Sequence, residues 1–283
     1  MAALGPFREL LQRDDAKIDL ARACLLVAQD AYPVLDIDHY LAELERMAAR
    51  LRARMADATA AEDKLIALNE FLFEDLGYSG NADDYYDPRN SYLNDVMDRR
   101  TGIPITMSVL YMELGRRVGL PLEGVSFPGH FLVRVRMRRG MLVLDPFAGG
   151  VPQSEDELRE RLKRVVPRGA IGRVPPEALP MDTFLEPATN RQILGRLLRN
   201  LKGIFREKDE PSRLLEVLDR ILVVNPDAHA ELRDRGLVYE RLECWRPALQ
   251  DIRDYVEREP DAADAEEMRA RMIELSARCA RLN

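Results

Sequence analysis

The sequence predicts an α+β protein in three parts: a helical N-terminal region, a central helix packed on a small antiparallel sheet, and an all-α repeat segment. Apolar residues recur at helical spacing through the first eighty residues. Alternating apolar and charged residues after position 130 indicate two paired strands. A tripeptide that starts at Pro226 starts again at Pro260, 34 residues later, which indicates a helical repeat.

Three apolar stripes predict the N-terminal helices. In each stripe the apolar residues return every three or four positions, as one buried face of an amphipathic helix requires. The stripes comprise Leu20, Cys24, Val27 and Ala28; Tyr40, Leu41, Leu44 and Met47; and Leu65, Leu68, Phe71 and Leu72. Residues 77–100 lose this period and are rich in turn formers, so we expect a long ordered loop there.

A mostly buried central helix is predicted over residues 104–118. Pro104 suits its first turn, because the N–H that proline lacks has no partner at that position. Apolar residues recur through the segment, and Gly119 provides the stop signal.

A β-hairpin is predicted from residues 131–137 and 141–144, which flank a short turn. With that turn centred near residue 139, Asp145 lies opposite the region of Val133. His130 and Asp145 then lie near the same end of the hairpin, within reach of a hydrogen bond. A shift of one residue in register would instead place them on opposite faces.

Five prolines between residues 166 and 187 indicate a junction between domains, since each proline interrupts a helix. We therefore expect two domains, residues 1–187 and residues 188–283.

The C-terminal segment resembles tetratricopeptide repeats, which have the same 34-residue period. In the unit 229–262, large and small packing residues occupy the positions typical of that family: Leu232, Gly236, Tyr239, Ala248, Ile252, Tyr255 and Pro260. The preceding unit, 195–226, matches less closely, because Lys202 stands where a small residue is usual. The third unit provides only a capping helix.

The order of motifs in the middle of the chain resembles a transglutaminase or papain-type core, in which a cysteine on a helix meets a histidine and an aspartate on adjacent strands. His130 and Asp145 match the last two parts. The position of the cysteine falls near Pro104 or Ile105, neither of which is a nucleophile. The three cysteines lie elsewhere, at Cys24, Cys244 and Cys279.

Two interpretations of this site stay open. In one, Thr106 or Ser108 is the nucleophile of a hydrolase or acyltransferase acting on an amide or ester, with His130 as base and Asp145 as orienter. In the other, the triad is an inactive remnant, and the Thr106 hydroxyl caps or packs the helix.

Candidate binding residues come from the segment before the central helix and from the helix itself. These are Asn90, Ser91, Asn94 and Ser108, which carry hydrogen-bonding groups that can face a cleft. The alternative for the first three is that they are turn residues satisfying their own backbone.

Four sequence blocks in this order resemble the bacterial SirB-type family. They run from Tyr85 to Leu93, from Arg99 to Thr106, from Phe127 to Arg134 and from Leu144 to Phe147. Members join a transglutaminase-like domain to tetratricopeptide repeats and usually lack the cysteine. The resemblance implies a non-catalytic protein- or peptide-binding or regulatory module, with the partner held by the repeats and the cleft.

Composition excludes several other classes. The net charge of −7 opposes general binding to nucleic acid or to an anionic membrane. No metal site is predicted, since no second histidine lies at ligand spacing from His130, and no cofactor is predicted, since no glycine-rich phosphate loop follows a strand. The sequence lacks the pattern of a signal peptide or a membrane span, and unpaired cysteines fit a cytoplasmic location.

Overall fold

The computed structural model describes residues 4–56, 58–138, 140–165 and 180–281. Contacts divide the chain into two compact units, residues 13–197 and residues 198–283 together with residues 1–12. The division falls inside one continuous helix, α8 (Asn190–Glu207). This grouping by contacts does not test whether residues 1–187 and 188–283 fold independently, so the domain boundary after residue 187 stays a prediction. Residues 166–179 of the predicted junction lie outside the described residues.

The three apolar stripes form the helices expected of them. They become α2 (Leu20–Ala28), α3 (Ile37–Arg54), and α4 (Ala61–Asn69) continued by the π-helical turn η2 (Glu70–Asp75). Two of these helices start at an aspartate whose carboxylate accepts a backbone N–H of the first turn, Asp19 for α2 and Asp36 for α3. The stripe residues are largely buried, which accounts for the helical period in the sequence.

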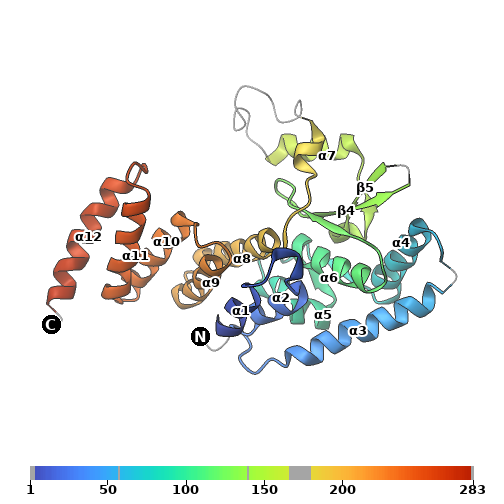
Figure 1. The fold of residues 1–283 in the computed structure, drawn as a ribbon, viewed down its shortest axis with the longest axis horizontal. Coiled ribbons are helices and arrows are strands. Elements are labelled where there is room, and N and C mark those ends of the chain that lie inside the picture. The colour runs from blue at the N-terminus through green and yellow to red at the C-terminus, as the bar shows by residue number, and fades with distance from the viewer. Residues whose placement is uncertain (1–3, 57, 139, 166–179, 282–283) are drawn as a thin grey trace. The chain divides into compact units, whose positions relative to one another are not determined.

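The central helix is α6 (Pro104–Arg117), and its residues from Pro104 to Gly115 are all buried. It is apolar nearly all round, and such a helix must be covered on every side. It contacts α2, α3 and α5 (Leu93–Arg99), as well as strand β4. Figure 1 shows α6 at the centre of these elements, as the sequence predicted.

The main sheet has the strand order β3-β4-β5-β6 and is antiparallel throughout. Its strands are β3 (Glu123–Val125), β4 (Leu132–Met137), β5 (Gly140–Asp145) and β6 (Val151–Pro152). The predicted hairpin is β4–β5, and its register pairs Val133 with Leu144. His130 and Asp145 therefore lie just beyond the same end of the ladder.

Two further observations complete this unit. Helix α7 (Glu155–Val165) packs Leu158 and Leu162 against sheet residues that include Leu132 and Val143.

Residues 77–100 are not one long loop as predicted: they contain β1 (Ser79–Gly80), the 3-10 turn η3 (Pro88–Ser91) and α5. Strand β1 pairs in parallel with β2 (Thr101–Gly102). The turn formers concealed α5, because its seven residues are too few for a clear helical period.

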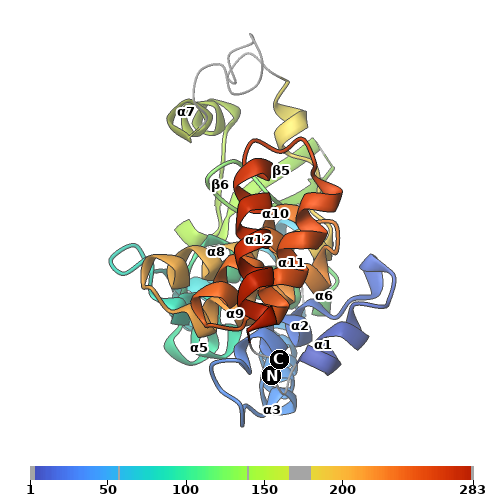
Figure 2. The same ribbon diagram turned by 90° about the vertical axis from the view of Figure 1, so that its left-hand side faces the viewer.

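The repeat unit continues from α8 with α9 (Pro211–Val224), α10 (His229–Arg241), α11 (Trp245–Arg258) and α12 (Ala265–Ala280). Figure 2 shows α11 and α12 side by side, and from α9 to α12 each helix contacts the next one in the chain. A β-carbon on Gly236 would lie 2.9 Å from Ile252, so the small residue of the repeat pattern permits close packing of α10 on α11. The α+β fold with a helical repeat segment is confirmed.

The same unit includes the N-terminal helix α1 (Leu4–Leu10). Phe7 is fully buried, and the guanidinium of Arg220 on α9 lies over its ring at 4.7 Å. By contacts, this helix groups with the repeats rather than with residues 13–197. Among the described residues, no helix is long and apolar enough to cross a membrane.

Candidate functional site

His130 and Asp145 form a buried pair at the end of the β4–β5 hairpin. His130 follows a tight turn in which Gly129 adopts φ 69°, and a β-carbon there would also lie 2.7 Å from Val165. Asp145 ends β5 and accepts the backbone N–H of Phe147 at 3.1 Å, which starts a 3-10 turn (Pro146–Ala148). The two side chains are 8% and 2% exposed.

The imidazole orientation is set by the carboxylate. His130 Nε2 lies 2.9 Å from each carboxylate oxygen of Asp145. A carboxylate only accepts hydrogen bonds, so Nε2 carries the proton in neutral His130, and Nδ1 is its basic nitrogen. Arg161 of α7 donates to Asp145 at 3.3 Å, and the Phe147 ring lies edge-on to the imidazole at 6.0 Å. These contacts fix the orientation of the His130 imidazole, as its use as a general base would require.

The predicted nucleophiles are engaged or buried elsewhere. Thr106 is 1% exposed; its hydroxyl donates to the Asn90 carbonyl at 2.7 Å and accepts the Ile103 N–H at 3.1 Å. Ser108 is fully buried, and its hydroxyl has no hydrogen-bond partner within the described residues. Neither hydroxyl bonds to His130 in the part of the chain that the structure describes. The structure thus brings His130 and Asp145 together, and it does not bring Thr106 or Ser108 to them.

The three cysteines offer no replacement. All are free thiols. Cys24 is buried in α2, and burial, aided by the negative charge of Glu113, raises the pKa of its thiol well above the usual range, which disfavours the reactive thiolate. Cys244 and Cys279 lie in the repeat unit.

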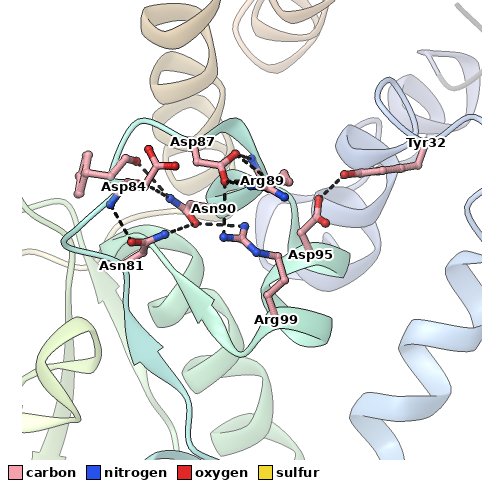
Figure 3. Close-up of polar contacts among 9 residues, drawn as sticks. Tyr32, Asn81, Asp84, Asp87, Arg89, Asn90, Asp95 and Arg99 are labelled. Carbon is pink, nitrogen blue, oxygen red and sulfur yellow. Dashed lines mark hydrogen bonds and ion pairs between the residues drawn. The ribbon is translucent and has the colours of Figure 1, made fainter.

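The segment before α6 forms a polar network of its own (Figure 3). Asn90 is fully buried; its amide donates to the Asp84 carbonyl at 2.7 Å, and its side-chain oxygen accepts from Asn81 at 3.1 Å. Asp87 accepts from Arg89 and pairs with Arg99 at 3.5 Å. The predicted binding residue Asn90 therefore serves to fix this segment.

Ser91 and Asn94 are buried as well, at 1% and 4% exposure. Within the described structure, the Ser91 hydroxyl and the Asn94 side-chain oxygen have no hydrogen-bond partner. Neither side chain reaches an open surface. A role for these residues in ligand binding stays a prediction.

We expect the two hydroxyls of α6 to respond oppositely to removal. Thr106→Val should lower the free energy of unfolding by about 1–3 kcal/mol, because it leaves the Ile103 N–H and the Asn90 carbonyl without a buried partner. Ser108→Ala is the matched control and should leave stability unchanged or raise it, because this hydroxyl is buried unpaired. Urea unfolding of both variants measures the difference. Equal losses would contradict the assignment of Thr106 as a structural tie.

The Asp87 carboxylate should make the fold sensitive to acid. Burial raises its pKa, but hydrogen bonds from Arg89 and the charge of Arg99 outweigh burial and hold the pKa below its usual value. A carboxylate with a depressed native pKa stabilises the fold above its unfolded pKa, about 3.9, and loses that contribution as the pH falls through the native value. Asp87→Asn should therefore destabilise the protein at pH 7, and the difference from wild type should shrink below about pH 4. A difference independent of pH would refute this.

The repeat unit contains an ion-pair cluster that no sequence motif indicated. Lys202, at the position where the repeats usually have a small residue, pairs with Glu231 and with Asp234 at 2.6 Å. Arg233 pairs with Asp234 and Asp264, both at 2.6 Å. The sequence did contain one sign of this cluster: Lys202 replaces the usual small residue of the repeat, and two acidic residues follow about one repeat later. In the other unit, Arg161 had no such signal, since only the folded chain brings α7 to Asp145.

Two cavities lie elsewhere in the unit of residues 13–197. The larger, about 550 Å³, is lined by the C-terminal half of α6 and by residues such as Leu120, Leu122 and Ile193. The smaller, about 280 Å³, lies between α3 and the end of α5. Neither is lined by His130 or Asp145.

The fold and site define a transglutaminase-like protein with tetratricopeptide repeats. A family model described as the transglutaminase-like superfamily matches residues 38–199, and a tetratricopeptide repeat model matches residues 201–272. The chain belongs to the bacterial family that comprises the UPF0162 proteins and SirB1.

The relatives match over most of their length. A UPF0162 protein of Xylella fastidiosa is 42% identical over 263 residues, which is 93% of this chain and 92% of the relative. One from Vibrio cholerae is 27% identical, covering 94% and 96%. Protein SirB1 of Salmonella typhimurium is 28% identical, covering 81% and 82%. The names of these relatives do not state a chemical activity.

Proposed function

We propose that the protein is a non-catalytic protein- or peptide-binding module with a regulatory role. The observation that carries this proposal is the Thr106 hydroxyl at the start of α6. It is buried and committed to two backbone groups, where an active enzyme of this class needs an available nucleophile. The His130–Asp145 pair is then a retained part of the scaffold.

The repeat unit supplies the binding surface in this proposal. Arrays of helical repeats present extended concave surfaces to their partners. Gly203 on α8 lies 34 residues before Leu237, so the two occupy equivalent positions on the first helices of successive repeats. A β-carbon on Gly203 would meet no atom within 4 Å, so this position opens onto free space.

The test is a peptide selected against the full-length protein from a displayed library. Its affinity is measured by fluorescence anisotropy for wild type, Gly203→Trp and the control Gly203→Ala. Blocking the surface with tryptophan should weaken binding by more than about tenfold, which corresponds to about 1.4 kcal/mol, while alanine should not. Equal affinity of all three proteins, together with equal affinity of a His130→Ala variant, would refute binding through the repeats or the cleft.

The proposal includes the cellular setting. The partner is a protein or peptide rather than nucleic acid or membrane, which accords with the net charge of −7. The reducing cytoplasm accords with three free thiols.

A second function has one observation in its favour, the intact histidine–aspartate geometry. In a hydrolase or acyltransferase acting on an amide or ester, Nδ1 of His130 would accept a proton from Thr106 or Ser108. This requires α6 to move, because neither hydroxyl bonds to His130 among the residues described. Chromogenic esters and amides test it: His130→Ala and Asp145→Asn should each lower turnover by orders of magnitude without a comparable loss of stability. A full rate in both variants would end this alternative.

A further inference from the structure

The cavity of about 280 Å³ lies between one face of α3 and the segment that follows η2. His39, Glu43 and Arg50 line it from α3, at positions that lie on one side of a helix. Tyr78 and the end of α5 complete it. All of these elements belong to one compact unit. The volume suits a small molecule rather than a chain segment.

Two arginines at this cavity have no acidic partner within the described residues. Arg50 lies over the ring of Phe71 at 5.3 Å and forms no ion pair there. Arg100 donates one hydrogen bond, to the Leu76 carbonyl at 3.0 Å, and its other side-chain N–H groups have no partner in the described part of the chain. Both side chains are exposed, and two guanidinium groups without an acidic partner among the described residues at one cavity offer donors to an anion.

The two carboxylates at the cavity are already engaged. Glu43 accepts from Arg46 at 2.8 Å, and Asp98 accepts the Tyr40 hydroxyl at 2.6 Å. The lining therefore carries two guanidinium groups, those of Arg50 and Arg100, and two carboxylates that each accept from another side chain. Among the described residues, the charged groups at this cavity that lack a charged or hydroxyl partner are the guanidinium groups of Arg50 and Arg100, which favours an anionic ligand.

The backbone at Arg100 decides which variant can remove its side chain. Arg100 follows the last residue of α5 with φ 58°, a left-handed conformation in which glycine is favoured at this position of a helix. Asp209 and Glu243 adopt the same conformation, so it is a common way for helices of this chain to end.

We propose that this cavity binds a small phosphate monoester, with Arg50 and Arg100 each donating to the phosphate oxygens. Guanidinium groups match the geometry of phosphate and hold it with paired hydrogen bonds. The apolar wall formed by Met47, Leu76 and Met97, with the ring of Tyr78, would contact the organic part of the ligand. This site is separate from His130 and from the repeats, so it does not depend on the function proposed above.

The experiment is a titration of the full-length protein followed by two-dimensional amide NMR, with phenyl phosphate, inorganic phosphate and benzoate as probes. We expect saturable shifts centred on α3 and α5. Phenyl phosphate should bind more tightly than inorganic phosphate, because its ring contacts the apolar wall. Benzoate, with the same ring and a smaller charge, should bind at least about tenfold more weakly than phenyl phosphate.

Two variants remove one guanidinium each. Arg50→Gln and Arg100→Gly should each weaken phenyl phosphate binding by about tenfold or more. Glycine suits the left-handed conformation at position 100, so this variant should keep the fold while losing the charge. Arg52→Gln is the control, because its half-exposed side chain lies on the same helix but does not line the cavity. Thermal unfolding verifies the fold of every variant.

Three outcomes would overturn the proposal. The first is the absence of saturable shifts from either phosphate probe up to about 10 mM, since weaker binding is no better than general ion attraction. The second is equal binding of benzoate and phenyl phosphate, which would replace phosphate by a carboxylate or by the ring alone. The third is an equal loss in Arg52→Gln and the two cavity variants, which would indicate a nonspecific charge effect.

Discussion

Replacing Arg235 by leucine is expected to lower the free energy of unfolding of the repeat unit by about 3–5 kcal/mol. Arg235 lies on α10 and pairs with Asp219 of α9 at 2.8 Å and with Asp251 of α11 at 2.7 Å. The two carboxylate side chains are only 9% and 7% exposed. Without the guanidinium, two buried negative charges would face each other with no cation between them, and desolvation makes such charges costly.

Urea unfolding measures this loss, and two comparisons identify its cause. Arg241→Leu removes an exposed pair with Asp209 and should cost less than about 1 kcal/mol. Adding Asp219→Asn and Asp251→Asn to Arg235→Leu should recover much of the stability, because the uncompensated charges are then absent. If the triple variant is no more stable than the single one, packing rather than charge explains the role of Arg235.

Phe7→Ala is expected to be the second large effect, a loss of about 3–5 kcal/mol. The ring is fully buried in the repeat unit and lies beneath the guanidinium of Arg220, which is itself 1% exposed. Alanine would leave a cavity and remove the aromatic face that contacts a buried cation. Phe7→Leu, which keeps most of the volume, should lose less.

Amide hydrogen exchange reports where the Phe7 variant is weakened. Faster exchange should centre on α1 and α9, whose contact Phe7 provides, and reach α12 less. A loss below about 1 kcal/mol would show that α1 is not an integral part of the repeat unit.

Much of this fold was predictable because its signals are periodic and local. The stripe through Leu44 and Met47 predicted α3, the alternation from Val133 to Val135 predicted β4, and the 34-residue spacing of Pro226 and Pro260 predicted the paired helices α10 and α11. Each pattern repeats the same physical requirement several times, so single exceptions do not hide it. Helix α5 was missed because seven residues among turn formers repeat the pattern too few times.

The candidate site was predictable only where its members lie close in sequence. A hairpin links His130 to Asp145, so an alternating pattern and a short turn were enough to predict that they meet. The state of Thr106 was not predictable, since a hydroxyl at the start of a helix can face a cleft or bond to the backbone. The carbonyl that it contacts belongs to Asn90, sixteen residues earlier.

The sequence by itself determined the fold class, the family and the lack of a cysteine at the start of α6, and it placed His130 and Asp145 within reach of each other. Only the tertiary structure decided that Thr106 is committed to the backbone, that Arg161 reaches Asp145, and that α1 packs with the repeats. The tertiary structure also decided which arginines form ion pairs with carboxylates. Among the residues described, Arg235 forms such pairs, whereas Arg50 and Arg100 form none. The physical reason is that periodic burial is encoded locally, whereas the partner of a polar group depends on how distant segments meet.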